Sequence, residues 1–380
     1  MVPNPAIRLI RMLLVALLAT AATVASATAA RADSVRDQQW HLDKLDIAEA
    51  HRITRGAGVT VAVVDSGADS QHPDLAGALT EGKSFGGGGG DGWDDEKGHG
   101  TGMATLIAGR GHGVANRDGV LGIAPEASIT PVRVGSHERS ENRAVELGVE
   151  WAVEHDADVV NLSLGGGVAP DLAGILDRAW EKGIIVVAAV GNTDGGASDV
   201  SPLATYPGVI AVSGTNEEGG FSVTSAKGPE VVLAAPATDI VVGDIKKRGL
   251  YSTGTGTSNA TAIVSGVVAL VKAKYPDLDA ANIINRLIAT ADDKGPEGRD
   301  DEYGFGVVNP VKALTADVPE VKANPLLPGS ASSGTTHQAG EDPSGVTGTT
   351  IALGALGGVV ALGILVAAVV LLRRRRTPIG

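Results

Sequence analysis

Apolar runs of four to seven residues alternate with longer segments of helical periodicity through most of the chain. The runs are rich in Val, Ile and Ala, which is typical of parallel strands covered on both faces. They predict strands at residues 59–64, 128–134, 159–164, 184–190, 209–213 and 231–234. The periodic segments predict helices at residues 101–110, 142–154, 171–182, 260–275 and 280–291. Joined by crossovers, these elements make one doubly wound α/β domain with helices on both faces of a parallel sheet.

The N-terminal segment, residues 1–32, has the pattern of a secretory signal peptide. Arg8 and Arg11 precede an apolar run, and Ala-x-Ala patterns end at Ala27 or Ala32. This arrangement predicts export, with an uncleaved anchor helix as the alternative. About thirty residues separate this segment from the first strand, which is too short for a separately folded prodomain. We therefore expect none, and we expect residues 38–45 to pack onto the domain.

The C-terminal part of the chain predicts a membrane anchor. Residues 351–372 are apolar and uncharged, and as a helix they would extend about 33 Å, enough to span a bilayer. Four arginines follow directly, so the positive-inside rule predicts a single-pass type I protein of the cell membrane, with the main domain extracytoplasmic. A GxxxG spacing at Gly354 and Gly358 leaves dimerisation of this helix open.

The chain thus divides into five parts. They are a signal peptide (1–32), a globular domain with a short N-terminal extension (33–317), a flexible linker rich in Pro, Gly, Ser and Thr (318–349), a transmembrane helix (350–372) and a cytoplasmic tail (373–380). We find no internal repeat.

Charge and cysteine content exclude some functions. Seven of the 31 basic residues lie in the two terminal segments, which carry no acidic residue. The rest therefore has 24 basic against 44 acidic residues, a net charge of −20. An acidic domain repels phosphate backbones, so we expect no nucleic acid partner. The chain has no cysteine, so the stability of an exported domain has to come from core burial or bound ions rather than from disulfides.

Three short motifs carry the candidate chemistry. Asp65 lies in Val-Val-Asp-Ser-Gly at the end of an apolar strand, and His99 lies in Gly-His-Gly-Thr-Gly. Ser258 lies in Gly-Thr-Ser-Asn-Ala-Thr-Ala at a helix start. A carboxylate at the end of an apolar strand needs a partner, which a histidine supplies. A histidine held in this way can take the proton of a serine hydroxyl. The motifs predict nucleophilic catalysis in which Asp65 orients, His99 is general base and then acid, and Ser258 attacks.

Each of these residues has a structural alternative. Asp65 alone would fit a strand end that caps a turn, and Ser258 alone would fit a helix N-cap. Asp69 and Asp74 are nearby competitors for the carboxylate role, and both are expected in loops. Seven other histidines lack a comparable context and are expected in loops, on the surface or in packing; they are His41, His51, His72, His112, His137, His155 and His337.

Residues after two other strands predict the rest of the site. Asn192 follows the run 186–191, and its side-chain amide is a candidate donor to the oxyanion, together with the Ser258 amide. The segment after the third strand offers an extended backbone that a peptide substrate could pair with. The candidate substrate-binding residues are Ser163, Leu164, Gly165, Gly166, Ala189 and Gly191.

These motifs resemble the subtilase family over about residues 40–314, including Gly-Phe-Gly-Val-Val-Asn-Pro at 304–310. The chain order Asp, His, Ser is that of subtilisins. The resemblance implies a subtilisin-like fold and serine endopeptidase activity on proteins or peptides. The signal peptide, the Gln38–Trp40 entry, the linker and the C-terminal helix are similar to mycosins. That likeness implies a place beside a type VII secretion complex in actinobacteria.

The chain departs from the family pattern at several points. Subtilases usually have a second histidine where Gly102 stands and methionine where Asn259 stands, and mycosins often carry cystine pairs. Asn259 is expected to tune either the substrate pocket or the environment of Ser258. Subtilases often bind Ca²⁺, but no contiguous oxygen-ligand pattern is present, so no cofactor is required and calcium stays open.

Two features leave the function partly open. Residues 91–96, mostly acidic, either rim the cleft and favour basic substrate side chains or form a solvated flexible loop. The favoured function is an extracytoplasmic serine endopeptidase. The alternatives are a mainly structural subunit of a secretion complex with weak or occluded activity, and a nonspecific degradative protease.

Overall fold

The computed structural model describes residues 35–85, 90–135, 142–165, 171–193, 199–245 and 250–327. Its centre is a seven-stranded sheet in which neighbouring strands are parallel. In spatial order the strands are β2 (Lys83–Ser84), β5 (Ser128–Arg133), β1 (Thr60–Asp65), β6 (Val159–Leu162), β7 (Ile185–Ala189), β8 (Ile210–Thr215) and β9 (Leu233–Pro236).

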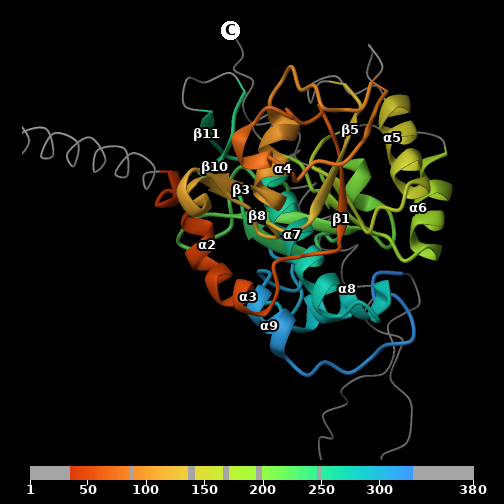
Figure 1. The fold of residues 1–380 in the computed structure, drawn as a ribbon. Coiled ribbons are helices and arrows are strands. Elements are labelled where there is room, and N and C mark those ends of the chain that lie inside the picture. The colour runs from red at the N-terminus through yellow and green to blue at the C-terminus, as the bar shows by residue number, and fades with distance from the viewer. Residues whose placement is uncertain are drawn as a thin grey trace, which may run out of the picture. The chain divides into compact units, whose positions relative to one another are not determined.

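Helices cover both faces of this sheet (Figure 1). On one face α4 (His99–Ala108) packs beside α7 (Thr257–Lys274), and on the other α5 (Asn142–Glu154) packs beside α6 (Leu172–Glu181). Every residue of α7 from Thr257 to Val271 is buried, so its apolar character on all sides fits a central helix. The smaller helices are α2 (Trp40–Lys44), α3 (Ile47–Ile53), α8 (Ala280–Ala289) and α9 (Pro310–Thr315).

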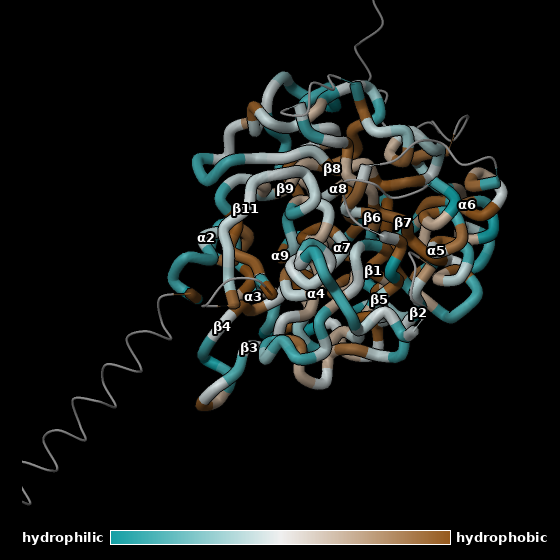
Figure 2. Tube along the Cα trace, turned by 90° about the horizontal axis from the view of Figure 1, so that it is seen from above, coloured by the Kyte–Doolittle hydropathy of each residue, from teal (hydrophilic) through white to brown (hydrophobic). Residues whose placement is uncertain are grey.

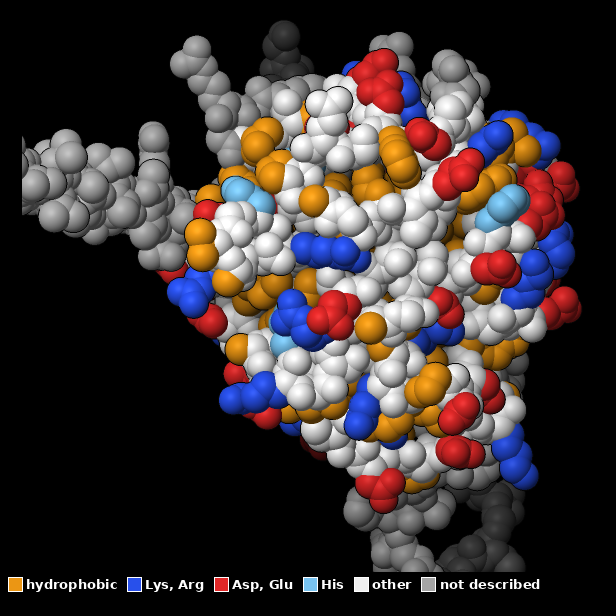
Figure 3. Space-filling view, in the orientation of Figure 1, with side chains coloured by type: hydrophobic (Ala, Val, Ile, Leu, Met, Phe, Trp, Pro, Cys, Tyr) orange, Lys and Arg blue, Asp and Glu red, His pale blue; other side chains and the backbone are white. Residues whose placement is uncertain are grey.

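Hydropathy follows these layers. In Figure 2 strands β6 and β7 are brown, whereas teal segments gather at the periphery. Figure 3 shows Asp and Glu side chains mixed with Lys and Arg over the face toward the viewer. That face carries no continuous basic surface of the kind that binds nucleic acid.

The predicted parallel α/β fold is confirmed, and each predicted strand and helix is present. Boundaries differ slightly: β6 ends at Leu162, and α7 begins at Thr257 rather than at residue 260. The sequence did not reveal the short elements, because two to seven residues carry too little periodicity to identify. The short elements include β2, α2, α3 and α9. They also include two hairpins: β3 (Arg110–His112) pairs with β4 (Asp118–Leu121), and β10 (Ile240–Gly243) pairs with β11 (Tyr251–Gly254).

The predicted membrane segments lie outside the described residues. Among the residues that the structure describes, no helix has the length and hydrophobicity needed to cross a membrane. The predicted signal peptide at 1–32, most of the linker at 318–349 and the predicted helix at 350–372 are not covered.

The N-terminal extension packs onto the domain, as predicted. Gln39 Nε2 donates to Leu121 O at 3.0 Å, and its Oε1 accepts from Leu121 N at 2.9 Å. Arg36 Nε donates to Gly119 O at 3.1 Å. These bonds add the extension to the edge of the β3–β4 hairpin, so it is an integral part of the fold.

His41 in α2 is fully buried, and neither ring nitrogen has a hydrogen-bond partner among the described residues. Burial lowers the pKa of His41 to about 3. The folded protein therefore holds a neutral imidazole, while the unfolded chain binds a proton below about pH 6.5. Folding stability is lost as the pH falls from about 6.5 toward 3.

We expect His41→Leu to make the protein less sensitive to acid. Between pH 7 and pH 5 the parent should lose about 2 kcal/mol more free energy of unfolding than the variant, because only the parent has this proton-linked cost. Urea unfolding of both proteins at the two pH values measures the difference. Parallel losses in the two proteins would contradict this role of His41, since all other titrating groups are shared.

Candidate active site

The carboxyl ends of three neighbouring strands meet at one edge of the sheet. Asp65 is the last residue of β1, Ser163 follows β6 directly, and Asn192 lies shortly after β7. Because β1, β6 and β7 are adjacent and parallel, these polar residues come together although they are far apart in sequence. Ligands of open α/β sheets bind in the crevice at this edge.

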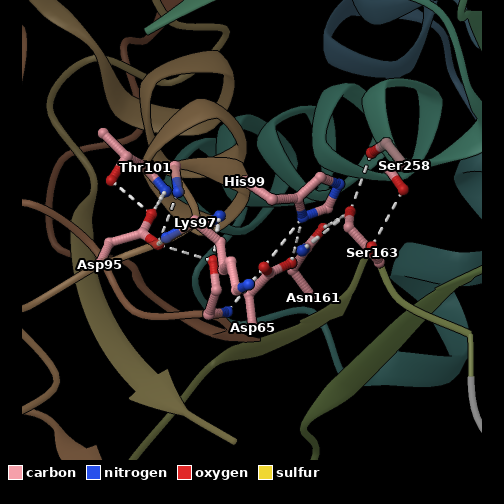
Figure 4. Close-up of polar contacts among 11 residues, drawn as sticks. Asp65, Asp95, Lys97, His99, Thr101, Asn161, Ser163 and Ser258 are labelled. Atoms are coloured by element: carbon pink, nitrogen blue, oxygen red, sulfur yellow. Dashed lines mark hydrogen bonds and ion pairs between the residues drawn. The ribbon is translucent and has the colours of Figure 1, made fainter. Parts of the chain in front are cut away.

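Asp65, which is buried, and His99, which is partly exposed, form a pair in this crevice (Figure 4). His99 Nδ1 lies 2.9 Å from each carboxylate oxygen of Asp65, and Ser66 N donates to Asp65 Oδ1 at 2.7 Å. His99 is the first residue of α4, and the next residue, Gly100, allows the close approach of this helix to β1. A Cβ at Gly100 would lie 2.1 Å from Gly67 O. The glycine beside the histidine is therefore a packing requirement.

The pKa of His99 reflects opposing effects. Burial alone would lower the pKa, but the negative charges of Asp65 and Asp95 and the hydrogen bond to Asp65 raise it above its usual value. The charged form is thus stabilised inside the site. A base in this position becomes neutral, and able to accept a proton, only above its raised pKa.

Asp95 is a second buried carboxylate beside the pair, with an exposed fraction of 4%. Oδ1 accepts from Ser66 Oγ, Lys97 N and Gly98 N, and Oδ2 accepts from the amide and hydroxyl of Thr101, all at 2.7–3.0 Å. Ser66 Oγ in turn accepts from Gly100 N at 3.0 Å. Asp95 therefore fixes the first turn of α4, and with it His99, against the end of β1.

This position corrects the expectations for residues 91–96 at Asp95 alone. At Asp95 the segment neither rims the cleft nor forms a solvated loop, because the carboxylate is used by five donors. Its neighbours do face solvent: the side chains of Asp94 and Glu96 are 78% and 70% exposed and lie near Arg133. The only sequence signal for Asp95 was its place four residues before His99.

We expect Asp95→Asn to move the acid limb of the kcat/KM profile to lower pH. Removing the charge lowers the pKa of His99, and the amide leaves backbone donors of α4 poorly satisfied, at a cost of about 1–3 kcal/mol in stability. The measurements are kcat/KM against pH and thermal unfolding. Asp94→Asn is the matched control, which should change neither. An unshifted acid limb in a folded Asp95→Asn protein would contradict this role.

Ser258 is held in the first turn of α7 by reciprocal bonds with Ser163. Ser258 Oγ donates to Ser163 O at 3.0 Å, and Ser163 Oγ donates to Ser258 O at 2.8 Å. The N-cap of α7 is Gly256, so Ser258 is not the N-cap serine of the structural alternative. Its amide lies at the positive end of an 18-residue helix.

Two further residues support this arrangement. Asn161 Nδ2 donates to Ser163 Oγ at 3.1 Å, and Asn161 Oδ1 accepts from Ser265 Oγ at 2.9 Å. Both Asn161 and Ser265 are fully buried. This network joins β6 to α7 and was not predicted. The signal for it was a polar residue inside the otherwise apolar run Val-Val-Asn-Leu.

Asn192 faces the start of the same helix. Its Oδ1 accepts from the amide of Thr257 at 2.9 Å and from the Thr257 hydroxyl at 3.2 Å. Since the backbone N–H of Thr257 can only donate, an oxygen has to lie at this position, which fixes the orientation of the Asn192 amide. The Nδ2 group is left to donate elsewhere, and Asn192 lines the same cavity as Ser258.

The predicted substrate-binding residues can contribute mainly backbone. Ser163 is fully buried and Leu164 and Ala189 are nearly so, so their side chains belong to the core. Gly165 has open space where a Cβ would lie, and Gly191 has a φ of +100°, which favours glycine. Gly166 lies outside the described residues.

The two competing carboxylates, Asp69 and Asp74, bond to groups other than His99. Asp74 lies in a short 3₁₀ helix, Pro73–Leu75, rather than in a loop. It is fully buried and accepts from Val120 N, Tyr251 Oη and His112 Nδ1, so its carboxylate is used away from His99. Asp69 caps its own turn, accepting from Gln71 N. Within the described part of the chain, no three His, Asp or Glu residues are grouped as a metal site would need.

A cavity of about 450 Å³ joins the candidate residues. His99, Asn192 and Ser258 all line it, together with residues of α4, β10 and β11. The structure thus brings the histidine, the serine and the asparagine to one solvent-filled space, with Asp65 behind the histidine. This arrangement supports acyl transfer through an activated serine.

Comparisons with known proteins agree with the fold. A model of the subtilase family matches residues 56–306. Subtilisin E of Bacillus subtilis (strain 168) is 37% identical over 258 residues, 67% of this chain and 65% of that protein. The minor extracellular protease Epr of the same strain is 33% identical over 288 residues, 74% of this chain. The matches span 42% of Epr and just under two thirds of Subtilisin E.

Solved structures are similar as well. MycP1 from Mycobacterium smegmatis is 29% identical with a TM-score of 0.64, covering 80% of this chain and 89% of that one. The MycP3 protease of the type VII (ESX-3) secretion system is 31% identical with a TM-score of 0.64, covering 73% and 88%. The match of the family model over residues 56–306, together with this fold, shows that the chain belongs to the subtilase family.

Proposed function

We propose that this protein is a serine endopeptidase in which Asp65, His99 and Ser258 act as a catalytic triad. The observation that carries the proposal is the Asp65–His99 pair at 2.9 Å beside a cavity that Ser258 also lines. Nδ1 of His99 is occupied by the carboxylate, which leaves Nε2 as the basic atom.

The reaction would proceed in two halves. The Ser258 hydroxyl turns from Ser163 O toward His99 by rotation about its Cα–Cβ bond, and His99 Nε2 takes the proton as Oγ attacks the peptide carbonyl. The oxyanion accepts hydrogen bonds from Asn192 Nδ2 and the Ser258 amide. When the C–N bond breaks, His99 gives the proton to the leaving amine. Water then hydrolyses the acyl-enzyme by the same steps.

Substrate would bind as an extended peptide along Ser163–Gly166 on one side and Ala189–Gly191 on the other. The buried side chains of Ser163, Leu164 and Ala189 leave mainly backbone groups for this contact. Pairing of backbone groups gives affinity for any extended peptide, and the neighbouring pockets then select side chains.

The cellular setting is the second part of the proposal. A signal peptide at 1–32 and a helix at 350–372 would tether the domain to the outer side of the cell membrane by the linker 318–349. The named type VII secretion systems of MycP1 and MycP3 support a role of this chain beside such a complex. There it would act on exported proteins.

Three otherwise identical strains test this role: one with the parent chain, one with Ser258→Ala and one lacking the protein. A processing enzyme predicts that exported substrates stay uncleaved in both altered strains. If the Ser258→Ala chain corrects every defect of the deletion strain, the protein acts as a structural subunit and the enzymatic role is wrong. Broad digestion of casein by the purified protein would instead indicate a nonspecific degradative protease.

A further inference from the structure

The cavity beside Ser258 lies on one side of the nucleophile only. Its walls come from α4 and the loop before it, the β10–β11 hairpin, Asn192 and the start of α7, and none of residues 163–165 or 189–191 lines it. The acyl part of a substrate would lie along those two segments. The cavity therefore lies on the side of His99, where the leaving amine has to receive its proton.

Gly102 opens one wall of this cavity. A Cβ at this position would lie 3.3 Å from Val242 Cγ2 and 3.4 Å from Gly243 O, so α4 packs closely on β10 here and any side chain would press against β10 or extend into the cavity. Gly102 lines the cavity, so a side chain at this position would narrow it.

Asn259 supplies a fixed acceptor in another wall. Its Nδ2 donates to Gly254 O at 3.0 Å and to Ala237 O at 3.3 Å, which uses both amide hydrogens and fixes the orientation of the group. No donor among the described residues bonds to Oδ1, and this atom is not enclosed. Since Asn259 lines the cavity, its oxygen is the part of the side chain left for a ligand.

From these contacts we infer that the cavity binds the side chain of the residue that follows the scissile bond, the P1′ residue, and selects a neutral hydrogen-bond donor such as glutamine. Lys97 and Asp244, of opposite charge, both line the cavity, so neither sign of charge is favoured there. The inference rests on the proposed endopeptidase activity and assigns Gly102 and Asn259 as specificity-determining residues.

Two peptides that differ only in a P1′ glutamine or methionine test the inference, because these side chains are similar in length and shape. With the full chain in detergent, kcat/KM should be about tenfold higher for glutamine, the size expected of one hydrogen bond in a partly open site. Taking the ratio within one enzyme preparation cancels any general loss of activity.

Two variants sharpen the result. In Asn259→Leu, which has the same branched shape without the acceptor, the glutamine-to-methionine ratio should fall to about one or below. In Gly102→Ala, kcat/KM for both long side chains should fall relative to a peptide with P1′ glycine. A glutamine-to-methionine ratio near one in the parent overturns the inference. So does an unchanged glutamine-to-methionine ratio in folded Asn259→Leu, or an unchanged preference for long side chains over glycine in folded Gly102→Ala. The parent and Gly102→Ala results decide the matter if Asn259→Leu fails to fold.

Failure of the proposed function has a different outcome. If the parent cleaves none of the peptides and no cleavage depends on Ser258, the endopeptidase activity itself is wrong. If the parent cleaves them all at equal rates, the activity stands and only the P1′ pocket is wrong.

Discussion

Ser258→Ala should lower kcat for peptide hydrolysis by a factor on the order of 10⁶, a size known from subtilisins. Ser258 Oγ is the atom that we expect to attack, and alanine removes it, while the neighbouring Thr257 hydroxyl is bonded to Asn192 Oδ1. The measurement is hydrolysis of a fluorogenic peptide by parent and variant at equal concentration. The remaining rate should still exceed that in water, because the oxyanion donors and the binding surface are retained.

Ser201→Ala is the matched control. The Ser201 hydroxyl is enclosed and has no partner among the described residues, so its removal breaks no hydrogen bond found there. The control should keep its activity and fold. Equal activity of Ser258→Ala and the parent would contradict the assignment of the nucleophile.

Asp65→Asn should lower kcat by a factor on the order of 10⁴, again a size known from subtilisins and related proteases. The carboxylate of Asp65 accepts from His99 Nδ1 and so leaves Nε2 as the basic atom. An asparagine amide can donate to Nδ1, which places the proton on Nε2 and prevents this atom from accepting from Ser258. The loss of charge also removes one of the effects that raise the pKa of His99.

The competing carboxylates provide the controls for this prediction. Asp69→Asn removes the charge from a nearby turn without touching His99, and it should retain most of the activity. The residual activity of Asp65→Asn should show its acid limb at lower pH than the parent. A larger loss from Asp69→Asn than from Asp65→Asn would show that the wrong carboxylate has been assigned.

The main strands and the residues at their ends were predictable because they rest on local patterns. Runs such as 59–64 and 184–190 are apolar throughout, and a parallel sheet places the residues at their carboxyl ends along one edge. Asp65 and Asn192 could therefore be assigned to a common site before their distance was known. The order of the strands could not, since it depends on long-range pairing that leaves no periodic signal.

The features that the sequence did not reveal depend on contacts between distant or short segments. Asp95 looked like one acid among several, and only folding places Ser66 and Thr101 around it. Asn259 stood out as unusual, but its role requires the carbonyls of Ala237, which follows β9, and of Gly254, which ends β11. His41 gave no sign of complete burial, because the five-residue helix that carries it is too short to show a buried face.

Labelling with a fluorophosphonate probe tests the central assignment most directly, because the probe reacts with a serine only when a neighbouring base activates it. We predict one adduct per chain, found by mass spectrometry on the peptide that contains Ser258 and formed more slowly below the raised pKa of His99. Ser258→Ala should form none. An adduct on another residue, or peptide cleavage by a protein whose Ser258 stays unlabelled, would contradict the account.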